Sequence, residues 1–285
     1  MPEDAFQELL ARAVTDDVLR HQLLDGPKPD WQLLGIAPED GERLRSIDRQ
    51  RLEIFSRAIL TNRFGRIAES LPRTNLLLGE RAHDLFAQFC RSHPPENKIH
   101  REGLAFASFL DSLLGEAPEP WYLPEVLSYE AHLLDLRFRF DGDYGDRGPE
   151  AVSSASSQEA DLEALKKRIP RRLRHHRLLH LGCDIEPLLD HLASGTVPED
   201  VEHQPCFLLA HIEPSGACGR IVLNPPLVGL YLSVDGVTPG AALPDRAAAW
   251  LEAPELAQDP EFRTSCLAAL LELASRRVVS VGPAP

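Results

Sequence analysis

The sequence lacks the features of a membrane-spanning or exported chain. No apolar run reaches the about 20 residues that a helix needs to cross a bilayer. The first residues, Pro2-Glu-Asp-Ala5, show neither the basic nor the apolar part of a signal peptide. We therefore expect a cytoplasmic protein that does not enter a membrane.

Cysteine and positive charge are also scarce. The five cysteines are odd in number, scattered and without C-x-x-C spacing, which favours reduced thiols over a disulfide framework or a zinc site. Lysine and arginine total 30 against 44 acidic residues, so the formal net charge is −14. Phosphate contacts dominate the affinity of proteins for nucleic acids, and so acidic a chain argues against such a partner.

The common catalytic signatures are missing as well. The sequence contains no G-x-x-x-x-G-K loop, no G-x-G-x-x-G, no H-E-x-x-H and no G-x-S-x-G. His175, His176, His180 and Cys183 lie close together, but their spacing fits no zinc pattern, and alternation along a strand would direct His175 and His176 to opposite faces. We therefore predict no catalytic residue, no metal ligand and no cofactor held by this chain.

With 285 residues, of which 43% are hydrophobic, the chain is long enough for two domains with separate cores. Apolar residues recur at helical spacing through residues 1–145, which predicts a helical domain. Residues 146–160 hold a Ser-Ser-Ala-Ser-Ser run and little that is apolar, so they are predicted to be a linker. Residues 161–285 form the second predicted domain.

The second domain has the clearest local signals. Residues 207–212 and 220–223 are β-prone runs joined by a Gly-containing loop, which predicts a hairpin, and residues 178–181 predict another strand. Asn224-Pro-Pro begins a helix that ends before Asp235-Gly236, because asparagine caps helices and proline suits their first turn. Two more helices are predicted over 241–251 and 262–277. The expected fold class is α+β: a mainly α-helical N-terminal domain followed by a small winged-helix-like domain with a short antiparallel sheet.

The segments 223–236 (LNPPLVGLYLSVDG) and 267–279 (LAALLELASRRVV) resemble the PqqD-like recognition domains. Those domains bind the leader segments of ribosomally made peptides. An extended leader can add as a strand beside a sheet edge and place its side chains against a neighbouring helix. The peptide-binding residues implied here lie in one strand and one helix: Arg220, Ile221, Val222, Leu223, Leu267 and Leu271. Apolar residues of a small domain are also expected to fill its core, so both roles stay open.

A second resemblance covers the helical domain. Residues 51–59, 71–80, 89–95 and 103–110 carry, in this order, motifs similar to a helical family of unknown function that is often labelled DNA-binding. Residues 121–132 match the closing helix of that family, in which an acidic residue lies mid-helix.

The two domains together resemble the partner subunits of multinuclear non-haem iron oxidases that modify cysteines in ribosomal peptides, as in methanobactin and 3-thiaglutamate biosynthesis. The resemblance implies a non-catalytic subunit that binds the precursor leader and forms a heterodimer with a TIM-barrel iron oxidase. The iron would belong to the partner subunit. Two other classes stay open: a winged-helix transcription regulator that binds DNA, and an enzyme in its own right.

Residues 166–177 (KKRIPRRLRHHR) are the one strongly basic run. Such a run is often a solvated helix end, but it can also attract an acidic partner surface or an acidic peptide. Nucleic acid is a third option, against which the net charge of −14 argues. We take Arg171, Arg172 and Arg174 as the candidate partner-binding residues.

Overall fold

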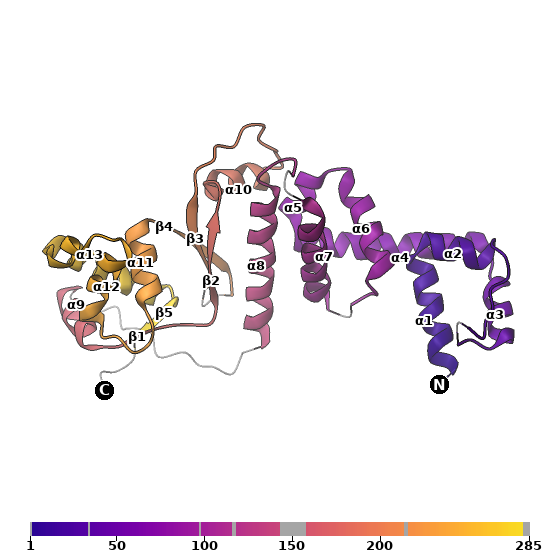
Figure 1. Cartoon of the computed structure of the whole chain (residues 1–285), viewed down its shortest axis with the longest axis horizontal. Helices are drawn as coiled ribbons and strands as arrows, with labels where there is room; N and C mark the ends of the chain where they lie inside the picture. The colour runs from indigo at the N-terminus through magenta and orange to yellow at the C-terminus, as the bar shows by residue number, and fades with distance from the viewer. Residues whose placement is uncertain are drawn as a thin grey trace. The chain divides into compact units, whose positions relative to one another are not determined.

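A computed structural model describes residues 2–33, 35–96, 98–115, 118–142, 158–213 and 216–281 (Figure 1). The chain divides into two compact units. Unit 1 comprises Met1–Ala131 and Leu192–Val197, and unit 2 comprises His132–His191 and Pro198–Pro285. No helix within the described ranges is both long and apolar enough to pass through a bilayer.

Unit 1 is helical, as its sequence predicts. Its helices are α1 (Pro2–Thr15), α2 (Asp17–Leu24), α3 (Pro38–Arg45), α4 (Arg49–Ser70), α5 (Pro72–Leu78), α6 (Arg81–Ser92), α7 (Ile99–Leu114) and the first part of α8 (Leu123–Gly142). Between α6 and α7 the buried rings of Phe86, Phe89 and Phe106 lie with their centroids 5.3 to 5.9 Å apart. Edge-on packing of this kind suits aromatic rings and holds the two helices together.

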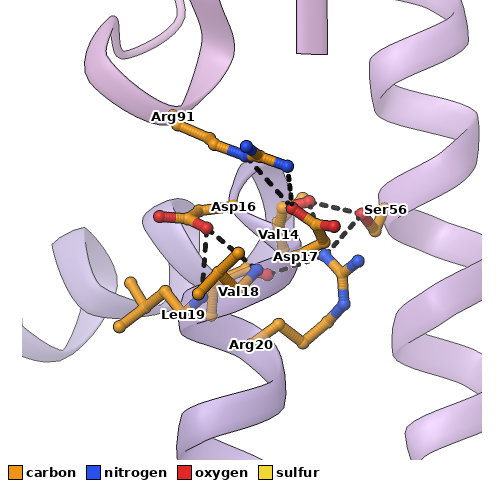
Figure 2. A network of polar contacts seen from close by, with 9 residues as sticks. Val14, Asp16, Asp17, Val18, Leu19, Arg20, Ser56 and Arg91 are labelled. Atoms are coloured by element: carbon orange, nitrogen blue, oxygen red, sulfur yellow. Dashed lines mark hydrogen bonds and ion pairs between the residues drawn. The ribbon is translucent and has the colours of Figure 1, made fainter. Parts of the chain in front are cut away.

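A network of polar contacts joins further helices of unit 1 (Figure 2). The Asp16 carboxylate accepts two backbone N–H groups of the first turn of α2, each at 3.0 Å, and so caps that helix. Arg20 donates to the hydroxyl oxygen of Ser56 in α4 at 2.8 Å and to two carbonyl oxygens at the end of α1. Arg91 of α6 donates to Asp17 at 2.9 Å. Four helices are therefore linked through one small network.

Unit 2 contains two small sheets. The three-stranded antiparallel sheet has the order β2 (His176–Leu181), β3 (Cys206–Ile212), β4 (Cys218–Leu223). The two-stranded sheet pairs β1 (Pro170–Arg172) with β5 (Val279–Val281). The remaining elements are α9 (Gln158–Lys167), α10 (Ile185–Ala193), α11 (Pro225–Ser233), α12 (Leu243–Trp250), α13 (Pro260–Ser275) and two short 3-10 turns, Gly240–Ala242 and Pro254–Gln258. The α+β fold class expected from the sequence is confirmed.

Each face of the three-stranded sheet is buried differently. Leu209 of β3 and Leu223 of β4 belong to a core shared with α9, α11, α12 and α13. On the opposite face, Ala210 and Ile212 of β3 pack against Leu136 in the last part of α8. Strand alternation requires this division, because successive side chains of a strand point to opposite faces.

The division between the units differs from the domain boundary that composition predicts. It falls inside α8, at residues 131/132, because the end of this helix packs on the sheet of unit 2. Most of the predicted linker, residues 146–157, lies outside the described residues, and α9 already begins at Gln158. Composition identifies a polar segment of the sequence. The boundary between compact units depends instead on contacts between residues that lie on either side of that segment.

Candidate functional site

Strand β4 lies at an edge of its sheet. It pairs with β3 in the register Phe207↔Leu223 and Leu209↔Ile221, and no other strand among the described residues pairs with it. An edge strand presents one row of backbone N–H and C=O groups that the sheet does not use. The hairpin predicted from the sequence therefore supplies an edge as well as a core face.

The register decides which backbone groups face outward from β4. On the side of β4, the Glu213 N–H donates to the Ala217 oxygen at 2.8 Å, so residues 213 and 217 form a hydrogen-bonded pair. On the side of β2, the Ile212 N–H donates to the His175 oxygen at 3.0 Å, so the even-numbered residues of β3 bond to β2. Hydrogen-bonded pairs occur at every second residue of an antiparallel ladder, and the odd-numbered residues of β4 therefore bond to β3. The outward-facing backbone groups belong to the even-numbered residues: Cys218, Arg220 and Val222.

The predicted peptide-binding side chains fall into two groups. Leu223 and Leu267 are only 3% and 5% exposed and fill the core of unit 2, whereas Ile221 and Leu271 are partly buried and pack against that core. Val222 is 40% exposed. Leu223 and Leu267 therefore belong to the core beneath the edge strand. Of the predicted apolar peptide-binding residues, only Ile221, Val222 and Leu271 retain accessible surface.

Arg220 is held by a neighbouring helix. Its guanidinium lies 3.3 Å from Glu186 and 3.4 Å from Asp190, one turn apart on α10. These partly exposed ion pairs contribute little to stability, but they fix the direction of the side chain beside the strand.

A second feature is an open groove of about 630 Å³ at the start of β2. It is lined by residues of α8, of the segment from β1 to β2, and of α11: Phe138, Arg139, Arg172, Leu173, Arg174, His175, His176, Arg177, Leu178 and Tyr231. The basic run in the sequence indicated Arg172 and Arg174, whereas no signal in the sequence indicated the contributions of α8 and α11.

The three candidate partner-binding arginines are exposed, but only two of them share a surface. Arg172 lies over the ring of Tyr231, 5.5 Å from its centroid, and Arg174 lines the same groove. Arg171 points elsewhere, since its aliphatic part lies beside Gly236 and it does not line the groove. Arg171 and Arg172 are successive residues of β1 and point to opposite sides of it, whereas residues 172–178 all line the groove.

Two buried side chains form the inner part of the groove. Burial lowers the pKa of His176 to about 4, helped by the nearby charges of Arg172 and Arg177, so its ring is neutral at pH 7. Burial also raises the pKa of Tyr231, and the Arg172 guanidinium opposes that shift. The two rings meet edge to face with their centroids 5.5 Å apart. The positive charge of the groove at pH 7 therefore comes from its arginines and not from His176.

Of the four candidate metal ligands considered in the sequence, Cys183 is completely buried, whereas His180 is exposed and stacks on Phe207. Within the described part of the chain, no three histidine, cysteine or acidic side chains gather in a way that could hold a metal ion.

The fold and these surfaces together define an α+β chain whose small C-terminal sheet has an accessible edge. Comparison with known families gives one finding: residues 40–112 match the model described as the SCO6045-like, C-terminal domain. The match covers most of α3 and α4 to α7, but none of the edge or groove in unit 2. No curated protein matches the chain.

Proposed function

We propose that this chain is a cytoplasmic, non-catalytic subunit that binds the leader of a ribosomally made precursor peptide. It presents the precursor to a TIM-barrel multinuclear non-haem iron oxidase, which modifies a cysteine near the precursor's C-terminus. The observation that carries the proposal is the edge position of β4, with the backbone groups of Cys218, Arg220 and Val222 directed outward. The resemblance of the two domains to such partner subunits supports it.

Strand addition explains how an edge of this kind recognises a peptide. An extended leader beside β4 exchanges main-chain hydrogen bonds with the outward-facing residues, which give affinity with little dependence on sequence. Each such bond contributes about 0.5–1.5 kcal/mol net. Strand β4 also contains no proline, so every one of its residues retains an N–H group.

Side chains on both faces of the sheet supply specificity. The exposed Val222 lies on the face of Ala210 and Ile212, and alternate leader residues would meet it there. On the other face, the partly buried Ile221 and Leu271 offer apolar surface that continues into the core. A leader with apolar residues at alternate positions fits this arrangement best.

The experiment is a leader titration with a proline at the outward-facing position. Val222→Pro removes an N–H that does not serve the β3–β4 ladder, and proline is tolerated at edge strands whose N–H faces solvent. We expect it to weaken leader binding at least about tenfold, because one main-chain bond is lost and the ring obstructs its neighbours. The matched control is Val222→Thr, which keeps the N–H group and the β-branched shape and should bind within about twofold of wild type.

Binding is measured by anisotropy of a labelled leader, after co-expression of the chain with a candidate iron oxidase and a candidate precursor from the same genome. A stable heterodimer that binds the leader supports the proposal. Circular dichroism of both variants is the control for folding. Equal leader binding by Val222→Pro and wild type contradicts strand addition at β4. Absence of both complex and leader binding contradicts the function itself, and DNA binding would then favour the winged-helix regulator.

A further inference from the structure

The groove at the start of β2 is lined by positive charge, although the chain as a whole is acidic. Four arginines line it, Arg139, Arg172, Arg174 and Arg177, and its lining includes no acidic residue. The whole chain, by contrast, has a formal net charge of −14. A positive concave surface on an acidic protein concentrates the field that attracts an anion.

Only part of this charge is compensated within unit 2. The Asp135 carboxylate pairs with both Arg139, at 2.9 Å, and Arg177, at 3.4 Å. Arg172 and Arg174 form no ion pair with any acidic side chain among the described residues. Neither charge is therefore neutralised by a neighbouring acid, and both guanidinium groups can pair with a ligand that brings its own negative charge.

The groove is also shaped for more than a bare ion. Its volume of about 630 Å³ falls within the roughly 300–1,000 Å³ of typical ligand sites. Phe138, Leu178 and Tyr231 supply apolar surface between the charges. The guanidinium of Arg172 is supported by the ring of Tyr231, which preorganises it for planar, bidentate pairing with a carboxylate.

We propose that this groove binds an acidic peptide segment, with glutamate or aspartate carboxylates on Arg172 and Arg174 and an apolar side chain against Phe138 and Tyr231. The mixture of arginine and apolar surface favours a peptide, because a nucleic acid would also meet the repulsion of the remaining chain. The site lies beside β2, at the edge of the sheet opposite to β4. It is therefore independent of strand addition at β4.

The test uses the full chain and two labelled octapeptides, one alternating glutamate with leucine and one alternating glutamine with leucine. We expect the glutamate peptide to bind at least about tenfold more tightly than the glutamine peptide, with an affinity that falls as salt rises. The double variant Arg172→Gln/Arg174→Gln should weaken the glutamate peptide about tenfold or more. Arg174→Gln alone changes an exposed side chain, so it should leave the fold intact and still weaken binding several-fold.

Two control variants decide whether the groove itself is responsible. Arg171→Gln removes the same charge from the same basic run outside the groove and should bind within about twofold of wild type. The preference for the glutamate peptide over the glutamine peptide should persist in Val222→Pro, because both peptides present the same alternate leucines to β4. Equal losses in Arg171→Gln and Arg174→Gln would overturn the proposal in favour of diffuse attraction. Equal binding of the two peptides, or tighter arginine-dependent binding of a single-stranded oligonucleotide, would also overturn it.

Discussion

At the scale of single residues, the buried acids of unit 1 have structural roles that explain their positions. Helix α5 has Leu71 at its N-cap, which cannot accept a hydrogen bond through its side chain. The carboxylate of Glu130 takes that role from α8, accepting the N–H groups of Arg73 at 3.0 Å and Thr74 at 2.8 Å. Glu130, one of two acidic residues in the segment 121–132, thus supplies a cap from a distant part of the chain.

The ion pair between Arg63 of α4 and Glu102 of α7 allows a direct test. The two side chains are 2.6 Å apart and only 5% and 1% exposed. Arg63→Met leaves the Glu102 charge buried without its partner, which should destabilise the chain by about 3–5 kcal/mol. The double variant Arg63→Met/Glu102→Leu should recover most of that loss, because no uncompensated charge remains. Urea unfolding of both variants measures the difference, and an equally unstable double variant would contradict this account.

At the scale of elements, local signals predicted most of unit 2. Asn224 followed by two prolines placed the start of α11, and the structure has that helix at Pro225–Ser233. The strands over 178–181, 207–212 and 220–223 and the two later helices were also predicted, and each is present with a shift of a few residues at its ends. Capping and turn residues act within a few positions of the element they limit, so one sequence is enough to identify them.

The same local signals do not predict contacts between segments that are distant in the sequence. Strands β1 and β5 have three residues each and pair Arg171 with Ser280, more than 100 positions away in the sequence. The groove likewise joins α8, β2 and α11, and only its arginines stood out from composition. Strand alternation and tertiary packing decide which members of a basic run share a surface, and neither follows from a count of charges.

The cap of α11 gives a prediction at this scale. The Asn224 side-chain oxygen accepts the N–H of Leu227 at 3.0 Å. Asn224→Ala should destabilise unit 2 by about 1 kcal/mol, whereas Asn224→Asp should stay close to wild type because aspartate caps equally well. For a unit of this size the alanine variant should melt about 2–4 °C lower. Thermal unfolding followed by circular dichroism checks this, and identical melting of the alanine variant and wild type would show that the cap is not used.

At the scale of the whole molecule, α8 belongs to both compact units, and the division between them falls within it. Its first part supplies Glu130 to α5 in unit 1. Its last part supplies Leu136 to the core of unit 2 and Asp135 to the arginines of the groove. A truncation designed from composition, beginning at residue 161, would therefore remove the helix that covers one face of the sheet behind β4.

The role of α8 in unit 2 can be tested in the full chain. Leu136 is completely buried against Ala210 and Ile212, so Leu136→Ala should cost about 2–5 kcal/mol through lost burial and the cavity left behind. Leu133, which is only partly buried in the same cluster, is the matched control and should cost less. Hydrogen exchange followed by mass spectrometry should show faster exchange of β3 in Leu136→Ala, with α4 to α7 unchanged. Unchanged exchange in β3 would mean that the sheet is stable without this helix, and a peptide-binding fragment could then begin after it.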